Sequence, residues 1–198
     1  MSETEEVRSA WGRIVRWLTA NAPSTAQALR GPATHEDIAG LREALGFEVP
    51  DVLEALLRMN NGSTAKDTTR TLPNGRVVPA RHLDSVIFPF GKVFLGCEEI
   101  IARRAQLLAS AQEAEGYWKP SLIPVIWDFE GAYHGYALDA SGASQSRMLT
   151  YAEVSPNETD PTVSLGELLT SFADGMDRGM WDVQRPLVEN GSLRWRED

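Results

Sequence analysis

The chain has 198 residues, of which 42% are hydrophobic and 24% are charged. This length suits one domain that buries a core without metals or disulfides, and the composition excludes a wholly disordered chain. The 19 basic and 28 acidic residues give a formal net charge of −9, which opposes binding to nucleic acid and favours encounter with basic surfaces, although a need for solubility also explains it.

Cys97 is the only cysteine, so no disulfide can form within the chain, and a reducing, cytoplasmic location fits best. The N-terminus lacks the basic-then-apolar segment of a signal peptide, and no apolar run approaches the roughly 20 residues that span a bilayer. We therefore expect neither secretion nor association with a membrane.

Two amphipathic helices are predicted near the N-terminus. Apolar side chains recur at helical spacing over residues 7–18, and acidic residues ahead of them suit the positive end of a helix dipole. The motif Asn21-Ala22-Pro23 should end this helix. The second helix is predicted from Thr34, an N-cap with Asp37 at a capping-box position, to Gly46.

A third helix is predicted after Pro50, where a first-turn proline is tolerated, and it should end at Asn60-Asn61-Gly62, which we interpret as a helix C-terminus that needs a left-handed residue. The polar residues 63–84 are predicted to form a loop with a short edge hairpin. Their Pro73-Asn74-Gly75 motif is typical of a turn, and Pro79 argues against a central strand.

The second half of the chain combines helices with short strands. A helix is predicted over residues 98–115, and another begins at the N-cap Ser164. A small hairpin is predicted about Asn190-Gly191. Between the two helices, β-rich runs separated by turn residues predict an antiparallel meander, and these runs are residues 122–127, 133–138 and 147–151. The predicted fold is therefore a single α+β domain over residues 1–198, with a central antiparallel sheet flanked by helices.

Several short motifs follow one another along the chain in a distinctive order and spacing. They are Asn21-Ala22-Pro23, the short helix over residues 38–46, Val49-Pro50, Asn60-Asn61-Gly62, residues 118–125 (WKPSLIPV) and Asp128-Phe129-Glu130-Gly131. Their order and spacing resemble the SUKH superfamily over nearly the whole chain. Members include yeast cell-wall assembly regulators and bacterial immunity proteins that bind and neutralise polymorphic toxins, often nucleases. The resemblance implies an α+β fold and a protein-binding role. Residues 63–84 and the tail after Trp181 depart from the pattern.

Candidate catalytic residues are few. Nucleophilic catalysis would need Cys97 or a serine beside a histidine, but His35, His82 and His134 lie in no recognisable signature. Cys97 is predicted at a helix start, which favours a thiolate, yet the following acidic pair opposes one, so a small buried or capping residue is the simpler interpretation. A small hydrolase using Cys97 or His134 stays open as an alternative.

Metal and nucleotide sites have little support in the sequence. Asp128, Glu130, His134 and Asp139 cluster around one predicted hairpin, but alternation along a strand sends neighbours to opposite faces and no known ligand spacing is met. The Gly91-Lys92 pair lacks the strand, glycine spacing and hydroxyl of a phosphate loop. We expect no metal and no cofactor.

Acidic and aromatic residues are the candidate contacts to a partner. Trp11 is assigned to the core and Trp118 to one edge of it, whereas aromatic side chains elsewhere could anchor an interface. Each acidic residue alone is most simply a solvated charge; together they are the predicted acidic face. The predicted partner-binding residues are Trp17, Glu98, Glu99, Asp128, Glu130, Tyr133 and Asp139.

The predicted function is non-enzymatic protein binding. An immunity protein that binds a toxin domain with a basic surface is the first hypothesis, and a regulatory scaffold like the yeast relatives is the second.

Overall fold

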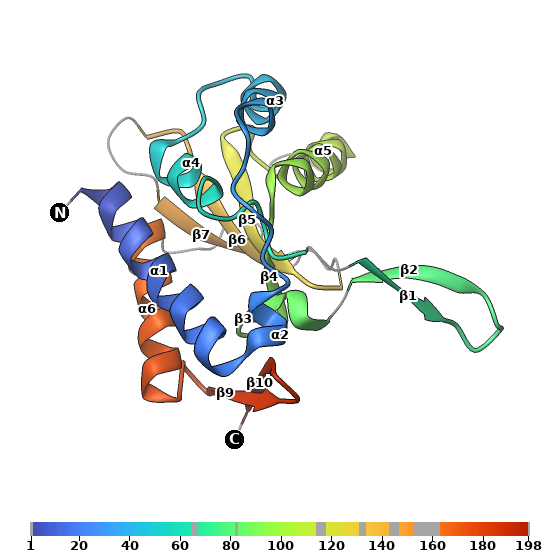
Figure 1. The fold of residues 1–198 in the computed structure, drawn as a ribbon. Coiled ribbons are helices and arrows are strands. Elements are labelled where there is room, and N and C mark those ends of the chain that lie inside the picture. Colours follow the sequence, from blue (N-terminus) through green and yellow to red (C-terminus); the bar gives the residue numbers. More distant parts are fainter. Residues whose placement is uncertain are drawn as a thin grey trace.

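The computed structural model of the chain describes residues 2–64, 67–81, 83–113, 118–130, 134–142, 147–152 and 163–197. Within them the chain forms a mixed α+β domain with a curled antiparallel sheet at its centre (Figure 1). This confirms the predicted fold class. The helices are α1 (Glu3–Asn21), α2 (Pro23–Ala26), α3 (His35–Leu45), α4 (Asp51–Leu57), α5 (Cys97–Glu113) and α6 (Leu165–Arg178).

Side-chain caps begin three of the helices. Ser2, Thr34 and Ser164 each accept a hydrogen bond from the backbone N–H three residues on, and the acidic side chain at that position bonds back to the cap N–H. Gly46 ends α3 in the left-handed conformation with φ of 78°. The predicted starts at Thr34 and Ser164 are therefore confirmed.

Six antiparallel strands form the main sheet in chain order. Its strands are β3 (Val86–Phe88), β4 (Lys92–Phe94), β5 (Leu122–Asp128), β6 (His134–Asp139), β7 (Arg147–Ala152) and β8 (Val163–Ser164). The predicted meander is confirmed as β5, β6 and β7. The strands β3, β4 and β8 were not predicted, because runs of two or three residues are too short for alternation to show.

Two further hairpins stand outside this sheet. They are β1 (Asp67–Thr71) with β2 (Val77–Arg81), and β9 (Gln184–Glu189) with β10 (Ser192–Glu197). Both hairpins were predicted, and the 3-10 turn η1 (Leu83–Ser85) follows the first. The C-terminal hairpin packs against the body, where the Leu193 N–H donates to the Thr25 hydroxyl at 2.9 Å. The hairpin of β1 and β2 projects away from it (Figure 1).

Aromatic side chains fill the core on both faces of the sheet. On the face covered by α1 and α6, the ring of Trp11 lies 5.3 Å from that of Phe94, and Phe172 of α6 lies 4.8 Å from Phe88. On the other face, Trp127 stacks on Tyr151 with ring centroids 5.5 Å apart. The guanidinium of Arg103 in α5 lies over the Trp127 ring. Trp11 and Trp118 are buried, as predicted.

One predicted helix boundary is wrong. Helix α4 ends at Leu57, three residues before Asn60-Asn61-Gly62. Gly62 does adopt a positive φ of 93°, and the Asn60 N–H still donates to the Leu56 carbonyl, but the side chains of Asn60 and Asn61 make long-range contacts. No helix among the described residues is long and apolar enough to cross a membrane.

Candidate functional site

Three charged or titratable side chains meet at one end of the sheet. Lys92 of β4 lies opposite Asp128 of β5, and His134 opens β6. The Lys92 Nζ lies 2.9 Å from His134 Nδ1, and His134 Nε2 lies 3.2 Å from Asp128 Oδ2. Gly135 pairs with Trp127, so alternation places the neighbouring His134 and Asp128 on the opposite face, the one that α6 covers. We call these three residues the Lys92 cluster.

The contacts in the Lys92 cluster define its protonation. Lys92 is only 6% exposed, and burial lowers the pKa of its ammonium although Asp128 opposes the shift. Burial, and then the positive charge of Lys92, lower the pKa of His134. The Lys92 ammonium can only donate, so Nδ1 of a neutral His134 accepts and its Nε2–H donates to Asp128. The pair of opposite charges is thereby bridged by a neutral ring.

This arrangement positions the turn after β5. The Phe129 N–H donates to the Gly91 carbonyl at 2.7 Å, and Lys92 Nζ lies 3.4 Å from the carbonyl of Phe90. Glu130 follows on this turn and is exposed. Because both ring nitrogens of His134 are engaged, the cluster resembles a structural support for the turn more than a base poised over a substrate.

A second polar junction surrounds the start of α5. Asn61 joins two helices there, because its Oδ1 accepts from the Cys97 N–H at 2.8 Å and its Nδ2 donates to Asp37 Oδ2 at 3.3 Å. Glu99 accepts from the Gly96 N–H at 3.0 Å and from the Thr64 hydroxyl at 2.7 Å. Its carboxylate therefore holds the helix start in place.

Cys97 is buried at this junction. Burial, followed by the nearby charge of Asp37, raises the pKa of its thiol to about 12. A thiol with such a pKa carries almost no thiolate at neutral pH and is a poor nucleophile. The prediction that Cys97 is a small buried residue is confirmed. No group of three or more His, Cys, Asp or Glu side chains in the described ranges is placed to hold a metal ion.

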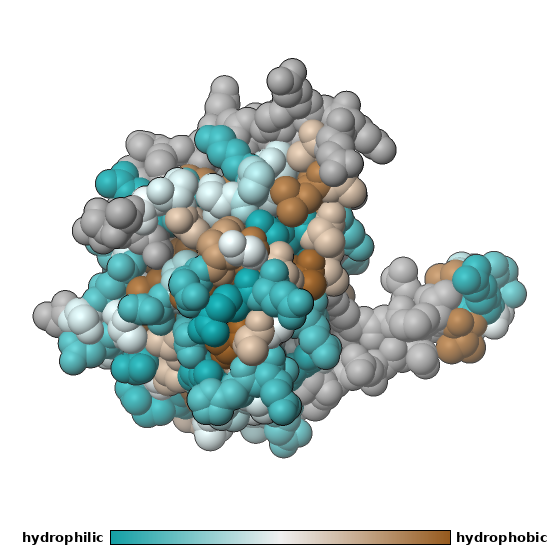
Figure 2. Space-filling model, turned by 90° about the horizontal axis from the view of Figure 1, so that it is seen from above, coloured by the Kyte–Doolittle hydropathy of each residue, from teal (hydrophilic) through white to brown (hydrophobic). Residues whose placement is uncertain are grey.

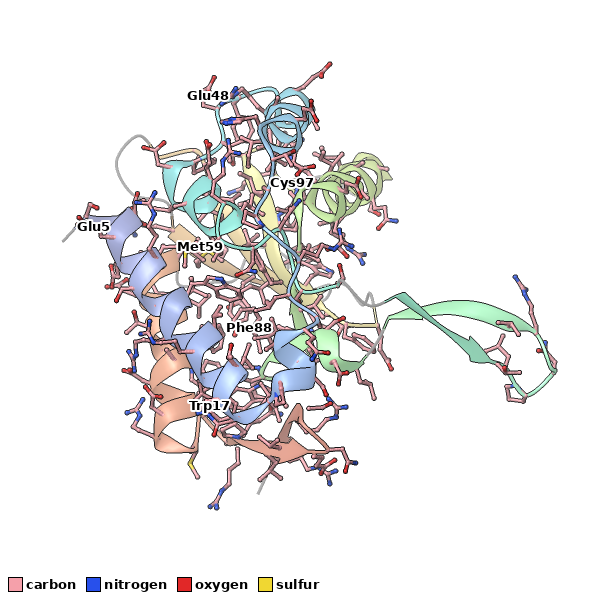
Figure 3. All side chains as sticks on the ribbon, viewed as in Figure 1. Glu5, Trp17, Glu48, Met59, Phe88 and Cys97 are labelled. Carbon is pink, nitrogen blue, oxygen red and sulfur yellow. The ribbon has the colours of Figure 1, made fainter. Side chains whose placement is uncertain are left out.

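The predicted partner-binding residues do not form one continuous face. Asp128 and Glu130 lie together, but Asp139 pairs with Leu122 at the far end of β5, six residues and about 20 Å away. Figure 3 shows Trp17 near the C-terminal hairpin, away from Cys97 at the start of α5 where Glu98 and Glu99 follow.

The burial of the predicted residues also varies. Trp17 is half-buried and packs against the core. Asp128 is buried, whereas Glu98 and Glu130 are exposed. Tyr133 lies outside the described residues. Among the predicted residues that the structure describes, exposed acidic side chains therefore lie at two places, the start of α5 and the turn after β5.

Sequence reasoning missed Lys92. The sequence pattern around Gly91-Lys92 bears only on a phosphate loop, and the burial of the lysine follows from the pairing of β4 with β5. A usable signal was present, because a lysine directly before Val93-Phe94 places a charge in an apolar strand.

Residues 32–177 match the family model described as SMI1 / KNR4 family (SUKH-1), which is more than half of the chain. The matched residues include the Lys92 cluster and the polar residues around the start of α5, and the match ends before the C-terminal hairpin. At the level of the family, it supports a protein-binding role of the immunity or regulator type. The comparison with curated proteins gives no match.

Proposed function

The chain belongs to the SMI1 / KNR4 family (SUKH-1), and on this premise we propose that it is an immunity protein that binds and neutralises a toxin domain. The observation that carries the proposal is the family match over residues 32–177. The order and spacing of the motifs resemble the SUKH superfamily, whose members include toxin-neutralising immunity proteins, and this supports the same proposal. It would act as a stoichiometric binder in the cytoplasm, without a cofactor.

The charge of the chain favours a toxin with a basic surface, such as a nuclease. A nuclease groove must be positive to hold phosphates, and a formal net charge of −9 complements it. Glu98 and Glu130 are exposed on well-fixed supports, the start of α5 and the turn beside the Lys92 cluster. These two places are the proposed contacts to the basic surface.

The experiment pairs the chain with the toxin-like protein encoded beside its gene. Binding is measured by calorimetry with purified proteins, and neutralisation by survival of cells that express the toxin with or without the chain. We expect a one-to-one complex well below micromolar Kd and restored growth. If no neighbouring product binds at micromolar concentration, the immunity proposal is wrong and a regulatory scaffold of the same family replaces it.

We also propose that the protein works without catalysis. The high thiol pKa of Cys97 and the engaged ring of His134 support this, since neither residue is set up as a nucleophile or a base. The double variant Cys97→Ala, His134→Ala should keep its neutralising activity as long as circular dichroism shows that it is folded. Because His134 also supports the turn that carries Glu130, only loss of activity in a folded double variant that still binds the toxin would favour the small hydrolase.

A further inference from the structure

The hairpin of β1 and β2 forms a sheet of its own that projects from the molecule. No other helix or strand packs substantially against it in the described part of the chain. Figure 1 shows the hairpin extending clear of the body, and Figure 2 shows its tip lying apart from the body. Val77 on this arm is 59% exposed. A two-stranded hairpin that packs on nothing is only marginally stable in water. As far as the described residues show, the arm therefore has no substantial stabilising contact with the body, and another chain could supply one.

The two free edges of the arm differ in their hydrogen-bonding capacity. The Leu72 N–H donates to the Arg76 carbonyl at 2.8 Å, so these two residues form a hydrogen-bonded pair in the register of β1 with β2. Hydrogen-bonded and non-hydrogen-bonded pairs alternate along the two strands, so Thr69 and Pro79 form a non-hydrogen-bonded pair. Pro79 has no N–H to donate to β1, which agrees with this position.

It follows that the backbone nitrogen of Pro79, which carries no hydrogen, faces the free edge of β2. Proline at this place is a usual device that prevents further pairing. Strand β1 has no proline, and three of its five residues are threonine, which favours strands. The N–H and C=O of Thr69 point to the free edge of β1. The arm is thus closed to pairing on one side and open on the other.

The sequence of β1 is self-complementary in an antiparallel pairing centred on Thr69. In that register Thr69 faces its own copy, Asp67 faces Thr71, and Thr68 faces Arg70. No like charges lie directly opposite, and threonine pairs across strands are favourable. We propose that two copies of this chain associate through their β1 strands, forming a four-stranded sheet with β2 at each outer edge.

This dimer is isologous and closes after two copies, because both chains use the same edge about one two-fold axis. Its dependence on salt separates it from toxin binding. Each copy carries a net charge of −9, so repulsion opposes self-association and added salt should strengthen it. Salt should weaken a complex with a basic toxin. The two proposals can therefore fail independently.

The first test is sedimentation equilibrium of the full chain without any toxin. The protein concentration runs from 1 to 100 µM, which covers roughly the dissociation constants of weak dimers. We expect a monomer–dimer equilibrium. Thr69→Pro should raise the dimer Kd at least about tenfold, because it removes the central outward donor from each chain without touching the bonds between β1 and β2. Val77→Pro, at the other free edge, is the matched control and should leave the Kd unchanged.

The second test is a cysteine crosslink. Facing residues in a hydrogen-bonded antiparallel pair have Cα atoms about 5.5 Å apart, which suits a disulfide. Thr69→Cys should therefore crosslink two chains under mild oxidation much faster than Val77→Cys, and the buried Cys97 should not interfere. Three results would each overturn the proposal. The chain could stay monomeric at 100 µM, roughly the upper limit for a weak dimer. The Thr69→Pro variant could dimerise normally, or both cysteine variants could crosslink equally.

Discussion

Trp11 shows how much of the core a single residue secures. It is fully buried, its ring packs on Phe94, and its Nε1–H donates to Asn60 Oδ1 at 2.9 Å. Truncation to alanine leaves a large cavity and an unpaired amide oxygen. We expect Trp11→Ala to lower the free energy of unfolding by about 3–5 kcal/mol in chemical denaturation.

Trp17 is the matched control for this prediction. It lies on the same helix and is half-buried against the core. Trp17→Ala should therefore cost clearly less than Trp11→Ala, because less surface returns to water and less cavity remains. Equal losses in the two variants would show that the buried stripe of α1 has been assigned to the wrong face.

His134 gives a prediction about pH. Burial and Lys92 place its folded pKa below the ordinary value of 6.5, so the unfolded chain binds the proton more readily. The free energy of unfolding should therefore have its full value above about pH 6.5 and fall as the pH drops through the folded pKa. A His134→Gln variant should lose this part of the pH dependence.

The pKa itself can be measured by NMR titration of the three histidines, with His134→Gln assigning the signal. Lys92→Met should raise the pKa of His134, because the positive neighbour is gone while Asp128 remains. A pKa at or above 6.5 in the native chain would contradict the neutral His134 inferred from the geometry.

The residue scale is where the sequence predicted least of the candidate site. The helical spacing of apolar residues over 7–18 correctly placed Trp11 in the core, and Cys97 was correctly expected to be buried, since both inferences depend on local sequence. The contacts of Lys92 with His134 and of Asn61 with Asp37 join residues 42 and 24 positions apart. Such pairings follow from strand register and helix docking, which periodicity does not contain.

At the scale of elements, Gly62 decides how closely two segments approach. Its φ is 93°, and a Cβ there would lie 2.6 Å from the backbone nitrogen of Gly96, which precedes α5. Gly46 also has positive φ, 78°, but a Cβ there would meet nothing within 4 Å. A substitution at Gly46 therefore tests the cost of the positive φ alone, whereas a substitution at Gly62 adds a steric clash with Gly96.

We expect Gly46→Ala to cost about 1–2 kcal/mol of stability, the usual penalty for a side chain in the left-handed region. Gly62→Ala should cost clearly more, because backbone atoms must also move. Thermal or chemical unfolding of both variants provides the measurement. Comparable losses would mean that the segments at Gly62 and Gly96 can separate without penalty.

Element prediction succeeded where the signal is local. Thr34 and Ser164 were identified from side chains that bond to backbone three residues away, and the turn residues located both hairpins. It failed for β3 and β4, which contain three residues each and owe their conformation to pairing with one another and with β5. The misplaced end of α4 has a similar cause, because Asn60 and Asn61 bond to distant partners.

At the scale of the whole molecule, the order of elements predicted the α+β architecture, and the family match agrees with it. The location of a binding face could not be predicted in the same way. Acidic residues that are near in sequence, Asp128 and Asp139, lie at opposite ends of one strand pair, and Asp128 is buried beside His134. Exposure and position in the sheet decide which charges a partner can meet.

A test of the acidic contacts by charge reversal should therefore change Glu98 and Glu130, which are exposed, and leave Asp128 and Asp139 unchanged. Exposed charges steer a partner of opposite sign and act mainly on the association rate. We expect Glu98→Lys with Glu130→Lys to slow association with a basic toxin about tenfold at low salt and to flatten the dependence of that rate on salt.

The matched control is Glu43→Lys with Asp51→Lys, two exposed acids on α3 and α4 whose reversal changes the net charge by the same amount. Surface-immobilised binding at two ionic strengths measures both double variants. If the control slows association as much as the test variant, the toxin responds to net charge alone. If neither variant slows it, the partner does not approach through acidic residues at all, and the basic-toxin part of the proposed function is wrong.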